Sequence, residues 1–234
     1  MFRLMGAAPQ INVKVFTFNP FRENTYLVWD EEGSCAIIDP GCYDEEECLR
    51  LRSYISSEGL APKAIWLTHG HFDHIFGVAD LAREFSIPVF MSSEDKPILE
   101  RDWSFAKGVG LEAPDVSFGF SGLEDGQVLH LGDGPVSFRV IATPGHTQGG
   151  VCFYCEGCGL LFSGDTLFAG AIGRSDLFGG DYDKEIVAIM EKLIVLPGDV
   201  DVLPGHGPKT SIAAERTSNP FLQPFNEPWE FETD

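Results

Sequence analysis

Basic side chains are scarce in this chain of 234 residues: 16 lysines and arginines stand against 36 aspartates and glutamates, which leaves a net charge of −20. A potential of that sign repels phosphate backbones, so nucleic acid is disfavoured as a partner. No stretch of sequence approaches the roughly 18–20 apolar residues that span a bilayer, and no membrane association is expected. The first residues, MFRLMGAAPQ, lack the apolar centre of an export signal, so we expect a cytoplasmic protein.

Cysteine accounts for only six residues. Disulfide-based secreted proteins are usually much shorter than this chain, so free thiols are expected. Cys152, Cys155 and Cys158 form a C-x2-C-x2-C run, a spacing that iron–sulfur and zinc sites also use. No fourth ligand lies nearby in the sequence, and the run is predicted to form a strand, a turn and a second strand. We therefore interpret Cys152 as a small buried hydrophobe.

Segments with strand and helix patterns alternate along the chain without an internal repeat or a linker, which predicts one α/β domain. This domain is expected to comprise residues 1–234, with a core at about 11–217 and a short tail at 218–234. Strands are predicted at 13–18, 24–29, 35–38, 64–67, 89–91, 128–131, 136–142, 151–154, 160–163 and 200–203. Helices are predicted at 44–58, at about 75–85, from the capping residue Asp183 to Pro197, and at about 212–216. Residues 103–122 show no period and are predicted to form an irregular loop.

Histidine is scarce as well, with six residues, and three of them lie in the short stretch THGHFDH. His69 and His71 form a His-x-His pair, which in an extended loop brings two neutral imidazoles to one cation such as Zn(II), Fe(II) or Mn(II). Asp73 and His74 are predicted to begin the next helix and to point their donor atoms at a neighbouring position. The stretch therefore indicates a metal site.

Three further donors follow other predicted strands: His146 in TPGH, Asp165 in SGD and His206 in PGHG. Taken singly, each such residue is more often a cap or a turn former than a ligand. Several donors at equivalent strand ends, however, are expected to meet, because sites assemble at those ends of helix-covered sheets. A carboxylate between two imidazole groups suggests a binuclear centre. His130 is not assigned to the metal site; it lies in a predicted strand and is predicted to face solvent.

The four motifs THGHFDH, TPGHTQGG, SGDTLF and LPGHG resemble, in order and spacing, the metal-binding motifs of the metallo-β-lactamase-fold superfamily. Asp39 in IIDPG matches the aspartate of the first motif of that superfamily. The resemblance extends from about residue 11 to 217. It implies an αββα sandwich, in which two mixed sheets lie face to face between helices and the metal ions lie at one edge.

Within the superfamily the chain is most similar to glyoxalase II-like (hydroxyacylglutathione hydrolase-like) hydrolases. This similarity implies two divalent metal ions, zinc being expected first and iron or manganese next, with three ligands each: His69, His71 and His146 for one, and Asp73, His74 and His206 for the other. Asp165 would bridge the ions, and Asp39 would orient the histidine loop. Catalysis is expected to depend on Asp73, His74 and Asp165.

The implied reaction is hydrolysis of a small-molecule thioester by a metal-bridging hydroxide. The chain departs from glyoxalase II at its end, where NPFLQPFNEPWEFETD stands in place of a basic helical extension that binds glutathione, so the thiol is left open. Arg174 and Lys209 are the candidates for substrate binding. A salt bridge of Arg174 with Asp176 or Asp181 is the alternative role for its guanidinium group.

Two other classes of function remain. Persulfide dioxygenases share the fold and a G-R-[ST]-D stretch, matched here by GRSD, and hold one iron ion with residues equivalent to His69, His146 and Asp165. The PGHGP context of the last histidine motif favours a hydrolase over this alternative. Among other relatives, β-lactamases are expected to be exported and RNA-cleaving enzymes to carry an inserted domain. Hydrolysis of a small ester or lactone ranks third, and the sequence predicts no oligomeric state.

Overall fold

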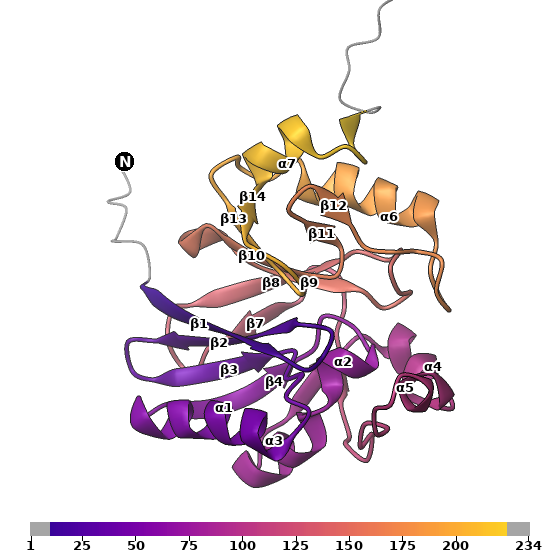
Figure 1. Ribbon diagram of the computed structural model, residues 1–234. Helices are drawn as coiled ribbons and strands as arrows, with labels where there is room; N and C mark the ends of the chain where they lie inside the picture. Colours follow the sequence, from indigo (N-terminus) through magenta and orange to yellow (C-terminus); the bar gives the residue numbers. More distant parts are fainter. Residues whose placement is uncertain (1–9, 224–234) are drawn as a thin grey trace, which may run out of the picture.

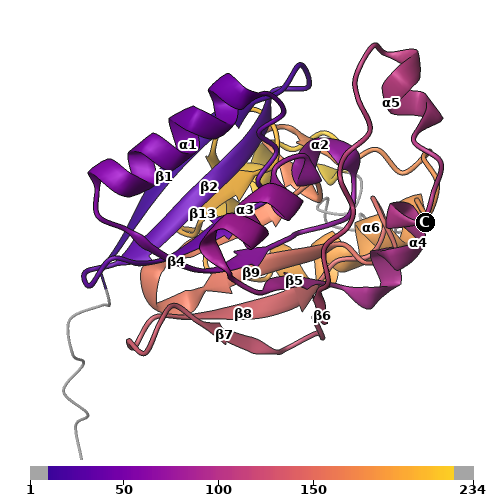
Figure 2. The ribbon, with the colours of Figure 1, turned by 90° about the horizontal axis from the view of Figure 1, so that it is seen from below.

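The computed structural model describes residues 10–223 of the chain, so residues 1–9 and most of the predicted tail lie outside the described residues. Two six-stranded sheets pack face to face, and helices cover the outer face of each, as Figures 1 and 2 show. This arrangement is the αββα sandwich, and the prediction of fold class is confirmed. The exact limits of the domain and its tail stay a prediction.

The first sheet is formed by the N-terminal half of the chain. Its strands, in spatial order, are β1 (Ile11–Phe18), β2 (Glu23–Asp30), β3 (Ser34–Ile38), β4 (Ala61–Trp66), β5 (Val89–Met91) and β6 (Ser121–Gly122). From β3 onward the pairs are parallel, so the chain must cross over the sheet between strands. The crossovers contain α1 (Glu45–Ser57), then α2 (Phe72–Ile75) and α3 (Val78–Phe85), and after β5 a short 3-10 helix η1 (Ser93–Asp95), α4 (Lys96–Leu99) and α5 (Ser104–Gly108).

The second sheet is formed by the C-terminal half. Its strands, in spatial order, are β14 (Thr210–Ser211), β13 (Asp201–Pro204), β10 (Leu160–Gly164), β9 (Val151–Cys155), β8 (Ser137–Ala142) and β7 (Val128–His130). A separate hairpin consists of β11 (Leu167–Phe168) and β12 (Ala171–Ile172). The outer face is covered by α6 (Tyr182–Ala188), the π-helical turn η3 (Ile189–Leu193) and α7 (Ile212–Ser218).

Large aromatic side chains pack with aliphatic ones in the space between the two sheets. Trp66 of β4 is 2% exposed, and its ring centroid lies 5.1 Å from that of Phe138 and 5.6 Å from that of Phe153, both on the opposite sheet. Rings at these separations add contact energy to the burial of their apolar surface. The sheets are therefore held together by a dry aromatic layer, and the edge of this layer is where the strands end and their loops begin.

Local packing explains where the helices differ from their predicted limits. The helix predicted at 75–85 is divided into α2 and α3, because the amide of Gly77 donates to Pro40 O at 2.9 Å and a Cβ at Gly77 would lie 2.3 Å from the Sγ atom of Cys42. The cap of α6 is Asp181, not Asp183: its carboxylate accepts from the amide of Lys184 at 3.1 Å. The sequence pattern alone does not distinguish two aspartates so close together.

The stretch 103–122, predicted to be an irregular loop, contains α5 and β6, so that prediction was wrong in part. β6 is formed by only Ser121 and Gly122, which pair with Phe90 and Met91 of β5. Two residues carry no period, and their pairing depends on a strand thirty positions earlier in the chain. Such a strand is set by tertiary contact and not by local sequence.

All six cysteines are free thiols, as predicted. Cys152 is fully buried in β9, whereas Cys155 and Cys158 are separated by one 3-10 turn, η2 (Glu156–Cys158), before β10 begins. Within residues 10–223, none of the groups able to hold a metal ion includes a cysteine. None of the helices in that range combines the length and the apolarity that crossing a bilayer requires.

Candidate metal centre

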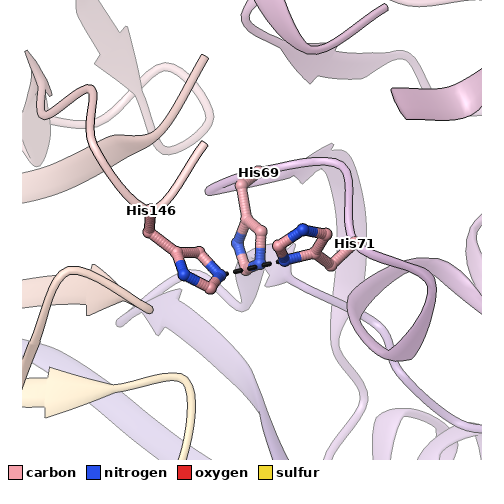
Figure 3. Close-up of side chains that lie close together, drawn as sticks. All are labelled: His69, His71 and His146. Atoms are coloured by element: carbon pink, nitrogen blue, oxygen red, sulfur yellow. Dashed lines mark hydrogen bonds between the residues drawn. The ribbon is translucent and has the colours of Figure 1, made fainter. Parts of the chain in front are cut away.

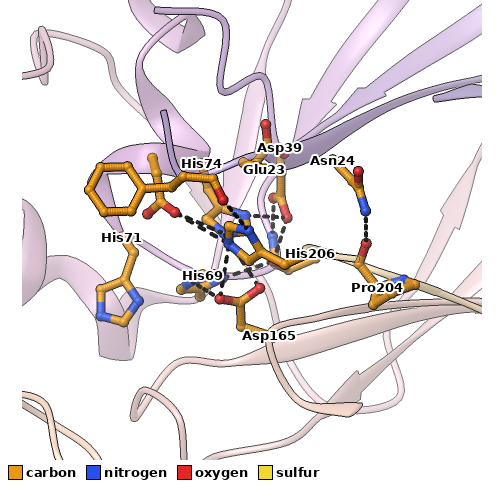
Figure 4. A network of polar contacts seen from close by, with 12 residues as sticks. Glu23, Asn24, Asp39, His69, His71, His74, Asp165, Pro204 and His206 are labelled. Carbon is orange, nitrogen blue, oxygen red and sulfur yellow. Dashed lines mark hydrogen bonds and ion pairs between the residues drawn. The ribbon is translucent and has the colours of Figure 1, made fainter. Parts of the chain in front are cut away.

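The side chains predicted as metal ligands gather at one edge of the sandwich, at the ends of strands from both sheets (Figure 4). The first sheet supplies four of them, from the loop after β4 and the first turn of α2: His69, His71, Asp73 and His74. The second sheet supplies three, from the loops after β8, β10 and β13: His146, Asp165 and His206. The remaining histidine of the chain, His130, is exposed on β7, as predicted.

Three histidines form the first group of ligand atoms, which we name the three-histidine group (Figure 3). The ligand atoms of His69, His71 and His146 all lie within 4.8 Å of one another. His71 Nδ1 is 2.9 Å from His146 Nε2, although the two residues come from opposite sheets. Two imidazole nitrogens at this distance need either a shared proton or a shared cation.

Asp73, His74 and His206 form the second group, which we name the mixed group. His206 Nε2 lies 3.3 Å from Asp73 Oδ2 and 3.3 Å from His74 Nε2. As in the three-histidine group, two members come from the first sheet and one comes from the second. Each group is therefore complete only when the two layers of the sandwich are packed together.

Asp165 lies between the two groups (Figure 4). Its Oδ2 atom is 3.5 Å from Nε2 of His146 and 3.5 Å from Nε2 of His206, and its Oδ1 atom is 3.5 Å from Nε2 of His74. Within the described residues, this buried Oδ1 atom has no hydrogen-bond partner. One carboxylate thus reaches ligand atoms of both groups, which is the position of a ligand that bridges two cations.

The outer ring nitrogens of two histidines are occupied by a hydrogen-bond chain that begins at Asp39. The hydroxyl of Thr68 donates to Asp39 Oδ2 at 2.5 Å and can therefore accept from His69 Nδ1, 3.0 Å away. Asp39 Oδ2 also accepts from His74 Nδ1 at 3.1 Å. A neutral imidazole with its proton on Nδ1 carries its lone pair on Nε2, so both rings direct that lone pair at the centre.

Backbone carbonyls fix two further rings, those of His146 and His206, in the same way. His146 Nδ1 donates to the carbonyl of Arg174 at 2.7 Å, and His206 Nδ1 donates to the carbonyl of Phe21 at 3.1 Å. The Nε2 atoms of His69, His74, His146 and His206 therefore converge on one small volume. Within the described residues, the buried Nε2 atom of His69 has no hydrogen-bond partner. A cation is the partner that such converging lone pairs fit.

The spacing of the donor atoms agrees with this interpretation. Four ligands at about 2.0–2.1 Å from a tetrahedral zinc ion are roughly 3.3 Å from one another. The separations between donor atoms within the two groups and to Asp165 range from 2.9 to 4.0 Å, and the pairs that link the two sheets cover the same range. A set of neutral imidazoles and carboxylates suits zinc, iron(II) and manganese(II). The residues present thus fit divalent metal ions.

Asp39 lies behind the ligands, as expected of a residue that orients the histidine loop (Figure 4). It is 2% exposed, and its Oδ1 atom accepts from the amide of Thr68 at 2.7 Å. Its φ angle is +48°, a left-handed conformation that few residues other than glycine, asparagine and aspartate adopt readily. The turn at Asp39 therefore aims one carboxylate at both the loop and the helix that carry ligands.

Burial and nearby charges give the histidines of the site different pKa values. Burial lowers the pKa of His71 to about 3 and holds the pKa of His69 well below its usual value, so both rings are neutral. Burial opposes the charge of His74 too, but Asp165 and Asp73 more than offset this effect and raise the pKa of that ring. His69 and His71 are therefore already in the neutral form in which imidazole binds a metal ion.

The structure does not bring the side chains of Arg174 and Lys209 into contact with the two ligand groups. Arg174 Nε and Nη2 donate to the carboxylate of Asp176 at 2.8 and 2.9 Å, which is the alternative pairing that the sequence allowed. Lys209 Nζ lies 3.1 Å from Asp201 Oδ2, at the opposite end of β13 from His206. Their roles in substrate binding stay predictions.

Several groups that hold the ligand loops were missed by the sequence analysis. The side-chain amide of Asn24 donates to the carbonyls of Pro204 and Gly207 at 3.1 and 2.9 Å, on either side of His206. The hydroxyl of Tyr26 donates to Pro204 O at 2.7 Å. In the sequence both residues belong to a strand pattern, NTYLVW, which gives no sign that their polar atoms reach another sheet.

A buried carboxyl group, Glu185 of α6, lies against the start of the GRSD loop. It is 0% exposed, and a Cβ on Gly173 would be 2.6 Å from its Oε1 atom. Neither carboxylate oxygen makes a hydrogen bond of normal geometry within the described residues. Burial raises the pKa of Glu185 from 4.5 to about 8, and the nearby amide of Gly173 offsets only part of that rise.

The raised pKa of Glu185 predicts a pH-dependent stability in chelated protein. Between pH 4.5 and about 8 the unfolded chain has lost this proton and the folded chain keeps it, so the free energy of unfolding falls as pH rises through that window. In Glu185→Gln the free energy of unfolding should fall by at least about 1 kcal/mol less over this window than in wild type, because the amide does not ionise. Urea unfolding at pH 5.5 and pH 8.5 measures the difference. The exposed Glu191→Gln is the matched control, and parallel pH profiles of wild type and Glu185→Gln would contradict the assignment.

Comparisons with known proteins agree with this geometry. The family description "Metallo-beta-lactamase superfamily" matches residues 18–211 of the chain. The hydroxyacylglutathione hydrolase GloC of Haemophilus influenzae is 37% identical over 218 residues, which are 91% of this chain and 98% of the relative. Two solved structures are similar throughout. The BLEG-1 B3 metallo-beta-lactamase has a TM-score of 0.82 and 35% identity, covering 90% of this chain and 99% of that one. TTHA1623, solved in a di-iron-bound form, has a TM-score of 0.79 and 39% identity, covering 89% of this chain and 100% of that one.

Proposed function

The chain belongs to the metallo-beta-lactamase superfamily and is a metallo-hydrolase of that family, and from this premise we propose that it cleaves a small-molecule thioester at a binuclear metal centre. The observation that carries the proposal is the position of Asp165, whose two oxygens reach ligand atoms of both groups. A carboxylate in that place can be shared by two ions. The similarity to a hydroxyacylglutathione hydrolase supports the choice of a thioester.

Each of the two groups would hold one metal ion. His69, His71 and His146 would hold one divalent ion, and Asp73, His74 and His206 would hold the other, with Asp165 shared. When bound, the ions would supply a hydroxide nucleophile near neutral pH and polarise the thioester carbonyl. Burial keeps His69 and His71 neutral, Asp39 orients His69 and His74, and backbone carbonyls orient His146 and His206, so that these rings are already in place when substrate binds.

We propose zinc as the first choice of metal and iron as the second. The donor set accepts either ion, and the similarity to a structure in a di-iron-bound form supports iron as a real alternative. Elemental analysis of freshly purified, unchelated protein identifies the metal. Two ions per chain are expected; fewer than one would overturn the binuclear proposal.

The reaction is tested by following thiol release from S-lactoylglutathione and from a panel of acyl-glutathione and acyl-coenzyme A thioesters. We expect release with at least one of these compounds, and none after chelation. A β-lactam is included because a similar structure is that of a B3 metallo-beta-lactamase. Fully metallated protein that opens the β-lactam but leaves every thioester intact would overturn the proposal.

Persulfide oxidation is the second candidate, because GRSD includes Arg174, whose carbonyl holds His146, and because Asp165 and His146 could also serve a single iron ion. Oxygen uptake with a glutathione persulfide separates the two functions. Uptake by protein that contains one iron ion per chain, without thioester cleavage, would favour the oxidase.

Arg174 is proposed to bind a carboxylate of the substrate. Its pair with Asp176 is exposed, with 63% of the arginine side chain accessible, and solvent screens such a pair, so a substrate carboxylate can compete for the guanidinium group. We expect Arg174→Ala to raise KM for a carboxylate-bearing thioester by roughly tenfold with little change in kcat. Asp176→Ala, which frees the guanidinium group, should not raise KM. An unchanged KM in Arg174→Ala would contradict substrate binding by this side chain and leave only its ion pair with Asp176.

A further inference from the structure

Asp95 is a fully buried carboxylate that belongs to none of the metal-binding motifs. It is the last residue of η1, directly after β5, and its exposed fraction is 0%. In the sequence it stands in SSEDK, where it has the appearance of one more solvated acid in a strongly acidic chain. Burial of a carboxylate destabilises the folded state unless its oxygens are hydrogen-bonded.

Each oxygen of Asp95 accepts from a loop that carries metal ligands. Oδ2 accepts from the amide of Gly70 at 2.9 Å and from the hydroxyl of Thr147 at 2.9 Å. Oδ1 accepts from the amide of Gly149 at 2.6 Å. Three donors thus satisfy one carboxylate, and they come from two different loops.

The positions of these donors in the chain are specific. Gly70 lies between His69 and His71, and Thr147 directly follows His146. Asp95 is therefore bonded next to each member of the three-histidine group and to no residue adjacent to His206. The loop after β4 and the loop after β8 come from opposite sheets, so this carboxylate joins the two layers at the point where that group is assembled.

One of the two glycines leaves room for this carboxylate. A Cβ at Gly149 would lie 2.7 Å from both the backbone nitrogen and Cγ of Asp95, distances that no side chain tolerates. At Gly70 a Cβ would lie 3.4 Å from Asp95 Cβ, which is close to ordinary van der Waals contact. Gly149 of the TPGHTQGG stretch thus allows the close approach of Asp95 to the loop after β8.

The charge of Asp95 is not balanced by a basic side chain. In residues 10–223 it makes no ion pair with lysine or arginine, and burial raises its pKa while the three hydrogen bonds lower it. A carboxylate that accepts three hydrogen bonds and lies behind the loops of three imidazole ligands favours a cation on the far side of those rings.

We propose that Asp95 is a positioning residue that fixes the two loops of the three-histidine group and thereby sets the metal affinity of that group and not of the mixed group. This inference rests on the proposed metal centre. It differs from the role of Asp39, whose carboxylate contacts His74 of the mixed group.

Asp95→Asn tests the inference with little change of shape. The amide can accept at one position only, so at least one of the Gly70, Thr147 and Gly149 donors would face an NH2 group. Competition of the protein with a chromophoric chelator for Zn²⁺ measures the affinity of each ion. We expect one of two ions to bind about 10- to 100-fold more weakly and the other to be unchanged.

Two further variants separate positioning from loss of fold. Glu94→Gln changes the same charge on the same turn but at an exposed side chain, and it should bind both ions like wild type. Thr147→Val removes one donor and leaves Asp95 intact, so it should weaken the same ion by a smaller factor. Circular dichroism of the chelated proteins verifies that each variant is folded.

A double-variant experiment identifies which ion is affected. In a His146→Ala background the three-histidine group is already disabled, so adding Asp95→Asn should produce no further loss of Zn²⁺. A further loss there, or wild-type affinity for both ions in Asp95→Asn, would overturn the inference while leaving the proposed function standing. Absence of bound metal in the wild type would instead overturn the proposed function itself.

Discussion

Asp165→Ala is expected to lower kcat/KM for thioester hydrolysis by at least about 10³-fold, because one substitution removes a ligand from both ions and the negative charge between them. Asp165 Oδ2 lies 3.5 Å from a histidine of each group, so both sites should lose affinity together. Thiol release measures the activity, and elemental analysis measures the ions retained. The same direction is expected for His71→Ala, which removes a ligand from one group only.

The fold should survive the loss of Asp165, since the ion-pair contacts of its carboxylate are with site histidines and the aromatic layer between the sheets is untouched. Asp199→Ala is the matched control, because it removes the same charge from an exposed position of the same half of the chain. Wild-type turnover by Asp165→Ala would mean that the centre is not where the chemistry takes place.

Removing the metal from wild-type protein should have the second large effect. A ligand present at about 1,000 times its Kd stabilises the folded state by roughly 4 kcal/mol, and in a chain of this length each kcal/mol corresponds to about 2–4 °C in Tm. Chelation should therefore lower Tm by roughly 10 °C and abolish turnover. Adding Zn²⁺ back should restore both. Thermal unfolding monitored by circular dichroism, run beside the thiol-release assay, gives the two readouts.

Chelation should lower Tm because it leaves ring nitrogens close together without the metal ion that would bind them both. His71 Nδ1 and His146 Nε2 are 2.9 Å apart, and His74 and His206 face each other at 3.3 Å. The chelated protein should nonetheless remain folded, because the hydrogen bonds of Asp39 and Asp95 hold the loops without metal. A Tm that does not change when the ions are stripped would contradict the placement of metal between these rings.

The strands of the core were predictable because their apolar patterns are local. β5 was predicted at 89–91 and is observed at Val89–Met91, and the donors that follow β4, β8, β10 and β13 converge as the strand-end argument requires. The two-residue strand β6 was missed, since only its pairing with β5 defines it. Likewise, the choice between Asp181 and Asp183 as helix cap depends on the residue at which the backbone becomes helical, which is Tyr182.

The ligand groups were predictable for a different reason from the groups that hold them. Histidines and aspartates in recurrent motifs are visible as letters in the sequence. The carbonyls of Phe21 and Arg174, which fix His206 and His146, belong to the backbone, and every residue has one. Asp95 is visible in the sequence but indistinguishable there from other acids, because its burial is decided by loops from two sheets.

The division of each ligand group between the two sheets has a consequence for how the protein matures. His74 and His206 are 132 positions apart, so a nascent chain that has emerged only through the first sheet offers neither ion a full set of donors. Cation capture must follow the docking of the C-terminal half onto the N-terminal half. The proposed ions would then crosslink two layers that are otherwise joined by apolar packing and by hydrogen bonds such as those of Asp95 and Asn24, and metal insertion would be the final step of assembly.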